Sequence, residues 1–194
     1  MRRLTLVLLA AFAAPALAQT TSTWEIDPAH SSIQFGVRHL MISTVRGTFP
    51  KFTATAVADE KDPTRSIVEA TIDAASIDTS DAKRDEHLKS PDFFDVAKYP
   101  SMTFKSTKVE AAGNNRYKLH GDLTIHGVTK PVVLDVEATP QVKGMRGETR
   151  AGARATTKIN RKDFGITWSK SMDGGGVVVG DEVDVTIDVE GVKK

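Results

Sequence analysis

The sequence contains no cysteine. A chain without thiols has no disulfide scaffold, no thiolate metal site, no cysteine nucleophile and no N-terminal cysteine for lipid attachment. Aromatic residues are also scarce, with eight Phe, two Tyr and two Trp among 194 residues. A chain with so few large side chains has little volume to fill a wide interior, which favours a hollow core if the fold is a barrel.

Neither sign of charge prevails. The chain carries 26 Lys and Arg against 25 Asp and Glu, and its basic residues form no run. A near-neutral chain of this kind argues against nucleic acid as a partner. Beyond the first eighteen residues, no segment approaches the ~20 consecutive apolar residues that a membrane-spanning helix requires.

The first eighteen residues have the pattern of a secretory signal peptide. Two arginines follow the initial Met, residues 4–14 are apolar, and Ala16-Leu17-Ala18 offers a small-residue cleavage site. We expect removal of residues 1–18, which leaves residues 19–194 as one domain with a sizeable core. The simplest location is the periplasm of a bacterium with two membranes, and full secretion is the alternative.

The clearest β pattern is a hairpin over residues 118–138. Apolar and polar residues alternate on both sides of a turn at Gly127, and a period of two gives each strand one apolar face. The apolar positions are Leu119, Leu123 and Ile125 before the turn and Val132, Leu134 and Val136 after it. Such a pair needs a second apolar surface, which other strands or a ligand can supply.

Six further segments predict strands and one predicts a helix. Residues 81–89 are charged, unbranched and free of Gly and Pro, so we expect a short helix capped by Ser80 or Asp81 that ends before Pro91. Gln19–Thr23 is expected to be a polar leader. The expected strands are residues 31–38, 46–58, 66–77, 102–111, 149–159 and 182–189.

Together with the hairpin these make eight strands. This number favours an all-β antiparallel barrel, closed so that no edge stays open, with a two-sheet sandwich as the alternative. An eight-stranded barrel is either filled by its own side chains or holds one small ligand. Small residues such as Ala151, Ala153 and Ala155 would leave an apolar void that accepts hydrophobic guests. The alternative is that the alanines pack closely or face outward.

The polar residues give little support for a metal site or for catalysis. The five histidines show no His-x-His or His-Glu-x-x-His spacing, and no Gly-x-Ser-x-Gly elbow occurs. The default role of such a histidine is structural pairing with a carboxylate, for example His30 with Asp27. No catalytic residue, metal or cofactor is therefore expected.

Several further motifs run in order along nearly the whole of residues 19–194. They are Trp24–Asp27 with His30-Ser31, Phe35–His39, Val45–Phe49, Arg84–Ser90 with Asp92–Asp95 and Tyr99-Pro100, Gly121–Pro131 and Asn160–Ile166. Each motif alone is weak, but together they resemble the YceI-like family of periplasmic polyisoprenoid-binding proteins. The resemblance implies an extended, lipocalin-like barrel that holds an isoprenoid chain in its lumen, with no established catalytic activity.

Under this resemblance the apolar faces line the lumen and touch the tail of a polyisoprenoid or an isoprenoid quinone. As ordinary core they would touch one another. The predicted lining residues are Phe35, Val37, Phe52, Val68, Ala70, Ile72, Phe104, Leu123, Ile125, Leu134, Val136, Val185 and Ile187. Phe93, Phe94 and Tyr99 follow the helix and either close one barrel end or pack the helix onto the barrel. A scavenger of other amphiphiles, such as fatty amides or hydrophobic antibiotics, and a lipid-modifying enzyme are the alternative functions.

Four polar residues are candidates for contact with the lipid headgroup. Arg38 and His39 end the first predicted barrel strand, and Arg84 or Arg161 suits a phosphorylated group, because guanidinium matches phosphate geometry. This hypothesis predicts that Arg84→Ala or Arg161→Ala weakens binding of a pyrophosphate-headed lipid but not of a quinone. The sequence leaves open a transient membrane contact and a homodimer formed through an exposed strand.

Overall fold

The computed structural model describes residues 21–171 and 176–194. The predicted signal peptide, residues 1–18, lies outside the described residues. The strands are β1 (Thr21–Ile26), β2 (Ser32–His39), β3 (Ser43–Thr48), β4 (Phe52–Asp59), β5 (Ile67–Asp73), β6 (Ser101–Ala111), β7 (Arg116–Ile125), β8 (Val128–Ala138), β9 (Val142–Lys143), β10 (Thr149–Asn160) and β11 (Val179–Lys193). The helices are α1 (Ala82–Lys89) and the short 3-10 helices η1 (Pro28–His30), η2 (Pro63–Arg65), η3 (Ala74–Ser76) and η4 (Arg161–Phe164). In this part of the chain, none of the helices has the length and apolar character needed to cross a bilayer.

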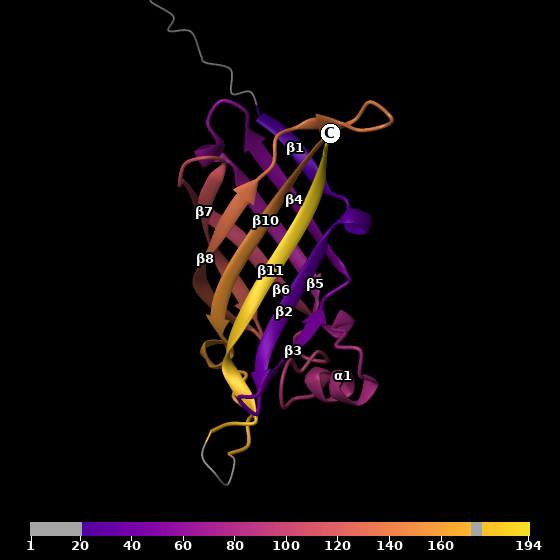
Figure 1. The fold of residues 1–194 in the computed structure, drawn as a ribbon, viewed down its shortest axis with the longest axis vertical. Helices are drawn as coiled ribbons and strands as arrows, with labels where there is room; N and C mark the ends of the chain where they lie inside the picture. The colour runs from indigo at the N-terminus through magenta and orange to yellow at the C-terminus, as the bar shows by residue number, and fades with distance from the viewer. Residues whose placement is uncertain (1–20, 172–175) are drawn as a thin grey trace, which may run out of the picture.

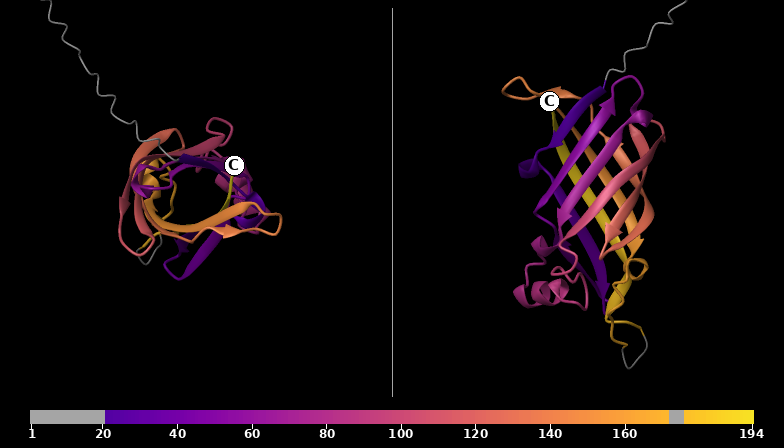
Figure 2. Two further views of the ribbon diagram at one scale, coloured as in Figure 1. Left: turned by 90° about the horizontal axis from the view of Figure 1, so that it is seen from above. Right: turned by 180° about the vertical axis from the view of Figure 1, so that it is seen from behind.

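Eight strands close into an antiparallel barrel (Figure 1). Their order around the wall is β11-β1-β4-β5-β6-β7-β8-β10, and β10 returns to β11 through a ladder from Arg150 opposite Val192 to Asn160 opposite Glu182. Seen from above, the strands form a ring (Figure 2). The predicted antiparallel eight-stranded barrel is therefore confirmed, and the two-sheet sandwich is wrong.

Two strands of the wall are broken into two pieces each. β1 and β2 pair with the same edge of β11 on either side of η1, while residues 49–51 separate β3 from β4. The single strand predicted over residues 46–58 is therefore two strands. Pro50 accounts for the break, because proline has no N–H to donate to a ladder. Phe49 N donates instead to Ile33 O at 3.0 Å.

β1 begins inside the segment that was expected to be a polar leader. The strand pairs with β4 on one side and β11 on the other. Ser22 and Trp24 are buried, and Thr23 between them is exposed. The prediction for this segment is wrong from Thr21 onward, because a strand that buries a serine at one inward position shows little apolar periodicity.

The predicted helix over residues 81–89 is confirmed as α1. The Asp81 side chain caps it by accepting hydrogen bonds from Lys83 N and Arg84 N, each at 3.1 Å. None of the residues of α1 is buried. Asp85 anchors the helix instead, because it accepts hydrogen bonds from the backbone N–H and the hydroxyl of Thr79, at 2.9 and 2.5 Å. α1 lies beside β3 at one end of the barrel (Figure 1).

The predicted hairpin forms β7 and β8. His126 and Gly127 make a two-residue turn with φ of 51° and 73°, a combination that matches the twist of the strands it joins. A second glycine, Gly121 within β7, allows the ring of Phe104 to lie against the sheet. A Cβ at this position would sit 2.3 Å from that ring. The strand wall is therefore shaped around one of the few large side chains that the sequence has.

Most buried aromatic side chains gather at the α1 end of the barrel. The larger core cluster contains Phe49, Phe52, Phe93 and Phe164. A smaller cluster of Phe104, Leu134 and Ala155 lies further along the wall. Concentrating the aromatic rings at one end leaves the rest of the interior to smaller side chains.

Candidate ligand cavity

A cavity of about 570 Å³ runs through the interior of the barrel. This volume falls within the range of about 300–1,000 Å³ that is usual for small-molecule sites. Its wall includes every residue predicted to line the lumen: Phe35, Val37, Phe52, Val68, Ala70, Ile72, Phe93, Phe94, Phe104, Leu123, Ile125, Leu134, Val136, Val185 and Ile187. The structure brings this set together, and its contact with a ligand stays a prediction.

Alanines explain why the interior is hollow. Ala54, Ala56, Ala70, Ala153 and Ala155 all lie on the cavity wall. At these inward positions, larger side chains from facing strands would meet and fill the barrel. The methyl groups of alanine are too short to meet, so the space stays open. The alternative that the alanines face outward is wrong for these five. Two of them, on β4, were not singled out from the sequence, although they share the alternation of Phe52.

Two groups of aromatic rings lie at the α1 end of the cavity. Phe49 contacts Phe35 and Phe94, with ring centroids 5.5 and 5.7 Å apart. Phe93 and His87 pack on Trp168 at 5.1 and 5.0 Å. Phe93 and Phe94 therefore pack the segment after α1 onto the barrel and line this end of the cavity at the same time.

Tyr99, grouped with these two residues in the prediction, lies elsewhere. Its ring stacks edge-on against His126 at a centroid distance of 4.6 Å and covers the β7–β8 turn. It is not part of the cavity wall. Trp168, in contrast, lies on the wall although nothing singled it out in the sequence, because it belongs to an irregular connection without periodicity.

Several polar side chains of the wall lie at the α1 end. They include Arg38 and His39 at the end of β2, Thr79 before α1, and Arg84 and His87 on α1. Arg84 donates from Nε to Thr79 Oγ1 and from Nη2 to Thr79 O, both at 2.7 Å. Its Nη1 lies 3.9 Å from Asp81 Oδ2, which is a weak ion pair. Arg84 therefore keeps N–H groups that a polar ligand group could accept.

Arg161 also reaches the cavity wall, but its donors are already engaged. The residue is 5% exposed. Its guanidinium donates to four backbone carbonyls and one carboxylate, which are Gly180 O, Ile166 O, Trp168 O, Val179 O and Asp181 Oδ1, at 2.7–3.2 Å. These are all five N–H groups of an arginine. The headgroup role of Arg161 stays a prediction, and in this structure its side chain ties η4 to the start of β11.

The sequence model of the YceI-like domain matches residues 24–191. The chain belongs to the YceI-like family. Protein YceI of Escherichia coli is 43% identical over 165 residues, which cover 85% of this chain and 83% of that protein.

Two solved structures share the fold of this YceI-like chain. The crystal structure of Burkholderia cenocepacia BcnA matches with a TM-score of 0.75 and 26% identity, over 85% of this chain and 98% of that one. A polyisoprenoid binding domain from Saccharophagus degradans matches with a TM-score of 0.64, over 88% of this chain and 98% of that one. Its identity is 14%, so the likeness concerns the fold alone.

Three histidines of this YceI-like domain pair with carboxylates. The pairs are His30 with Asp27, His87 with Asp92 and His120 with Glu110, at nitrogen–oxygen distances of 2.9, 2.9 and 3.1 Å. The predicted pairing of His30 with Asp27 is therefore confirmed. His87 is the one member of these pairs that also lines the cavity.

An ion-pair network holds η1 of the YceI-like domain against the barrel. Arg150 donates to Asp27 Oδ2 at 2.9 Å and to Glu190 Oε1 at 2.5 Å. The hydrogen bond from Arg150, followed by the one from His30, lowers the pKa of Asp27 to about 2. A metal ion could in principle lie among Asp27, His30 and Glu190, whose ligand atoms are all within 4.8 Å of one another. The Arg150 guanidinium already forms ion pairs with the two carboxylates, Asp27 and Glu190.

Proposed function

We propose that the protein is a non-catalytic carrier that encloses a polyisoprenoid or an isoprenoid quinone in the barrel cavity, in the periplasm. The observation that carries the proposal is the polarity of the cavity. Almost all of its surface is apolar, and the polar residues Arg38, His39, Arg84 and His87 border it at the α1 end. An amphiphile with a long apolar tail and one polar head has the same distribution of polarity.

The length of the barrel suits such a tail. The twelve residues of β10 rise about 3.3 Å each, and at a strand tilt of about 40° they span about 30 Å along the axis. Burying each methylene stabilises a lipid by ~0.8 kcal/mol, so a tail of several isoprene units carries tens of kcal/mol of hydration penalty in water. A carrier has to enclose nearly the whole tail to move it through an aqueous compartment.

Three further observations support the proposal. The Saccharophagus degradans domain with the same fold is a polyisoprenoid binding domain by name. Among the described residues, the cavity wall holds no carboxylate, serine, lysine or tyrosine, and the hydroxyls of its two threonines, Thr79 and Thr157, donate to Asp85 Oδ1 and Val133 O. The pattern of residues 1–18 supports export to the periplasm.

Native mass spectrometry of protein purified without detergent tests the proposal. A stoichiometric isoprenoid adduct on a chain that begins at Gln19 is the expected result, since it reports both the ligand and the removal of residues 1–18. A mixture of unrelated amphiphiles would assign the protein to the scavengers. An empty protein that converts added lipid would make it an enzyme.

A variant pair tests whether the ligand occupies the barrel interior. Ala70 lines the cavity, while its neighbour Thr71 is exposed on the outer face of the same strand. We expect Ala70→Phe to fill the cavity and reduce isoprenoid binding at least tenfold, and Thr71→Phe to bind like the unmodified protein. Titration of both variants with the lipid measures the difference. Equal affinities would place the ligand outside the barrel.

A further inference from the structure

The turn between β2 and β3 presents apolar side chains to solvent. Met41 is 57% exposed and Ile42 is 78% exposed. Leu40 and Met41 have φ of 51° and 60°, in the left-handed region that Gly and Asn adopt and that bulky side chains avoid. Neither backbone preference nor solubility explains these residues at this turn. Residues held in such a conformation against their preference often belong to functional surfaces.

The turn is held in place by hydrogen bonds. Arg38 donates from Nη2 to Met41 O and Ile42 O at 2.8 and 3.1 Å, and Leu40 N donates to Val178 O at 2.9 Å. The backbone is therefore tied to β2 and to the segment before β11, while the two exposed side chains project from it. We call Leu40, Met41 and Ile42 the apolar tip.

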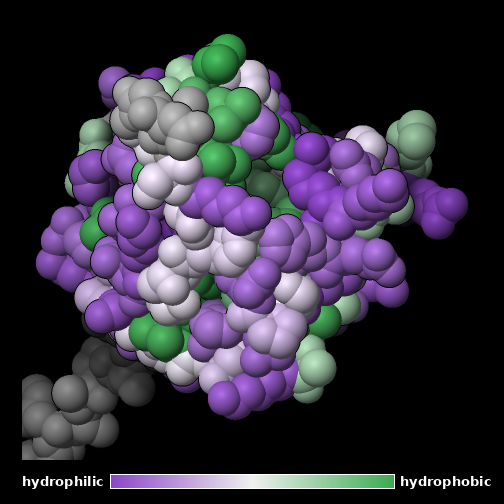
Figure 3. All heavy atoms as spheres, turned by 90° about the horizontal axis from the view of Figure 1, so that it is seen from below, coloured by the Kyte–Doolittle hydropathy of each residue, from purple (hydrophilic) through white to green (hydrophobic). Residues whose placement is uncertain are grey.

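The apolar tip borders the α1 end of the cavity. The residues that flank the tip or hydrogen-bond to it lie on the cavity wall, namely Arg38, His39, Val45 and Val178. A view of the molecule from below shows hydrophobic side chains gathered around a recess (Figure 3). The tip therefore stands beside the end of the cavity where the polar side chains of the wall gather.

Along the sequence, residues 28–58 around the tip carry only positive charge, while β11, which pairs with β2, brings Asp184 opposite Gly36. No Asp or Glu occurs between Pro28 and Ala58, whereas Arg38, Arg46 and Lys51 lie in this stretch. Arg38 and Arg46 are exposed, and the bonds of Arg38 go to carbonyl and hydroxyl oxygens. Exposed apolar side chains among cations have the chemistry of peripheral binding to anionic lipids.

We propose that the apolar tip docks the α1 end of the barrel onto an anionic lipid bilayer. Resting on the proposed carrier function, this inference gives the cavity a direct path to the membrane that holds its lipid. Met41 and Ile42 would enter the interface between headgroups and acyl chains, while Arg38 and Arg46 would meet anionic headgroups.

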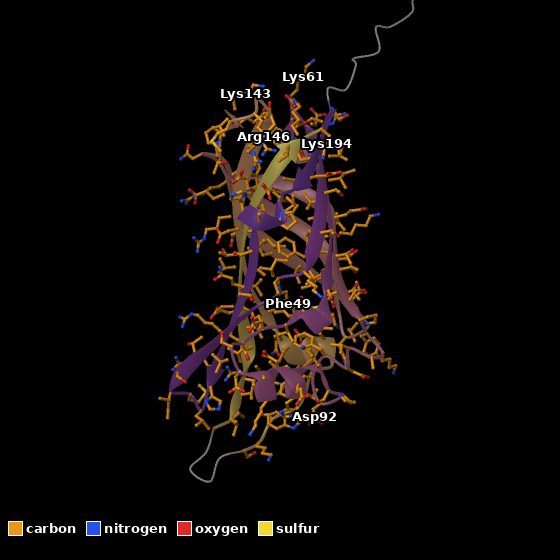
Figure 4. All side chains as sticks on the ribbon, turned by 90° about the vertical axis from the view of Figure 1, so that its right-hand side faces the viewer. Phe49, Lys61, Asp92, Lys143, Arg146 and Lys194 are labelled. Carbon is orange, nitrogen blue, oxygen red and sulfur yellow. The ribbon has the colours of Figure 1, made fainter. Side chains whose placement is uncertain are left out.

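The opposite end of the barrel provides a matched control. Val142 and Met145 are also highly exposed, and Lys143 and Arg146 lie beside them. Figure 4 shows Lys143 and Arg146 at the far end of the molecule from Asp92, which follows α1. None of these four residues belongs to the cavity wall. The two ends thus share a composition and differ in their connection to the cavity.

Flotation with phospholipid vesicles tests the proposal on the full mature chain. We expect co-flotation with vesicles that contain phosphatidylglycerol, weaker co-flotation with pure phosphatidylcholine, and weakening by salt. The double variant Met41→Asn/Ile42→Ser should lose about tenfold in partitioning, because it removes two inserted apolar side chains. It should stay folded, since Asn tolerates a positive φ. Met145→Asn should float like the unmodified protein.

Several results would contradict the docking proposal. They are an unmodified protein that does not float, a double variant that floats equally well, and a loss as large in Met145→Asn. Loss of a dimer by size-exclusion chromatography in the double variant, without any change in flotation, would assign the tip to a second copy of the chain. Native mass spectrometry separates the two proposals, because the double variant should retain its isoprenoid adduct. An unmodified protein that holds the lipid but does not float refutes the docking proposal alone. An unmodified protein that floats but holds no lipid refutes the carrier proposal alone.

Discussion

Arg161 is a buried cation that the protein satisfies from within. Five hydrogen bonds join its guanidinium to two carbonyls after η4, to two carbonyls at the start of β11 and to Asp181. Burial lowers the pKa of Arg161 from its ordinary value, and Asp181 opposes that shift. Loss of one partner from a buried pair typically costs about 3–5 kcal/mol, because the remaining groups are left without hydrogen bonds.

We therefore expect Arg161→Ala to lower the free energy of unfolding by about 3–5 kcal/mol, measured by urea denaturation. Arg84→Ala is the matched variant, since Arg84 is more exposed and engages mainly Thr79. It should cost about 1 kcal/mol and weaken binding of a pyrophosphate-headed lipid but not of a quinone. Equal effects of Arg84→Ala on the binding of both lipids would contradict a role for Arg84 in headgroup binding.

Asp27 makes the stability of the fold depend on pH in a narrow range. Its pKa is about 2 in the folded protein, below the ordinary value of 3.8. The unfolded chain therefore binds more protons between about pH 4 and pH 2, so the stabilisation is complete above that range and is lost as the pH falls through it. Between pH 5 and pH 2, the urea midpoint should fall less for Asp27→Asn than for the unmodified protein. An identical fall would mean that Arg150 does not stabilise the ionised carboxylate.

Alternation predicts strand residues of the cavity wall, because side chains two positions apart in a strand face the same side. This is why Val68, Ala70 and Ile72 could be assigned together. It cannot separate Arg84 from Arg161. The groups that occupy Arg161 lie between five and twenty positions away along the chain, and only the folded arrangement brings them to its donors.

At the scale of elements, β6 and β7 depend on a glycine that makes room for an aromatic ring. A Cβ on Gly121 would lie 2.3 Å from the Phe104 ring and 2.7 Å from Lys105 O, which is backbone and cannot move aside. Gly121→Ala should lower the free energy of unfolding by about 1–3 kcal/mol. Gly191→Ala is the control, because a Cβ there meets neighbours at 3.6 Å or more. Equal urea midpoints for the two variants would contradict the packing argument.

Local chemistry determines which elements the sequence reveals. α1 and the β7–β8 hairpin carry their own signals, a capping aspartate in one and a Gly turn between alternating strands in the other. β1 carries little signal, because its stability comes from β4 and β11, which pair with it from distant parts of the chain. The break at Pro50 was not predicted; β3 pairs with β2 as far as Thr48 opposite Gln34, and β4 begins only at Phe52.

At the scale of the whole molecule, the barrel has two unlike ends. The α1 end holds most of the aromatic rings and the polar side chains of the wall, while the alanines of β4, β5 and β10 line the cavity beyond them. A ligand that matches this distribution should lie with its head near α1 and its tail among the alanines. Reversal would place a polar head against methyl groups that offer it no hydrogen bond.

The two tryptophans report on this orientation. Trp168 lines the cavity beside His87 and Phe93, whereas Trp24 is buried on β1 outside the cavity wall. Because a quinone ring quenches a nearby indole, binding of an isoprenoid quinone should quench the fluorescence of Trp24→Phe, which retains Trp168, more than that of Trp168→Phe. A polyisoprenoid without the ring should quench neither variant. Stronger quenching in Trp168→Phe would mean that the head points away from α1, and the polar groups at that end would then need a different role.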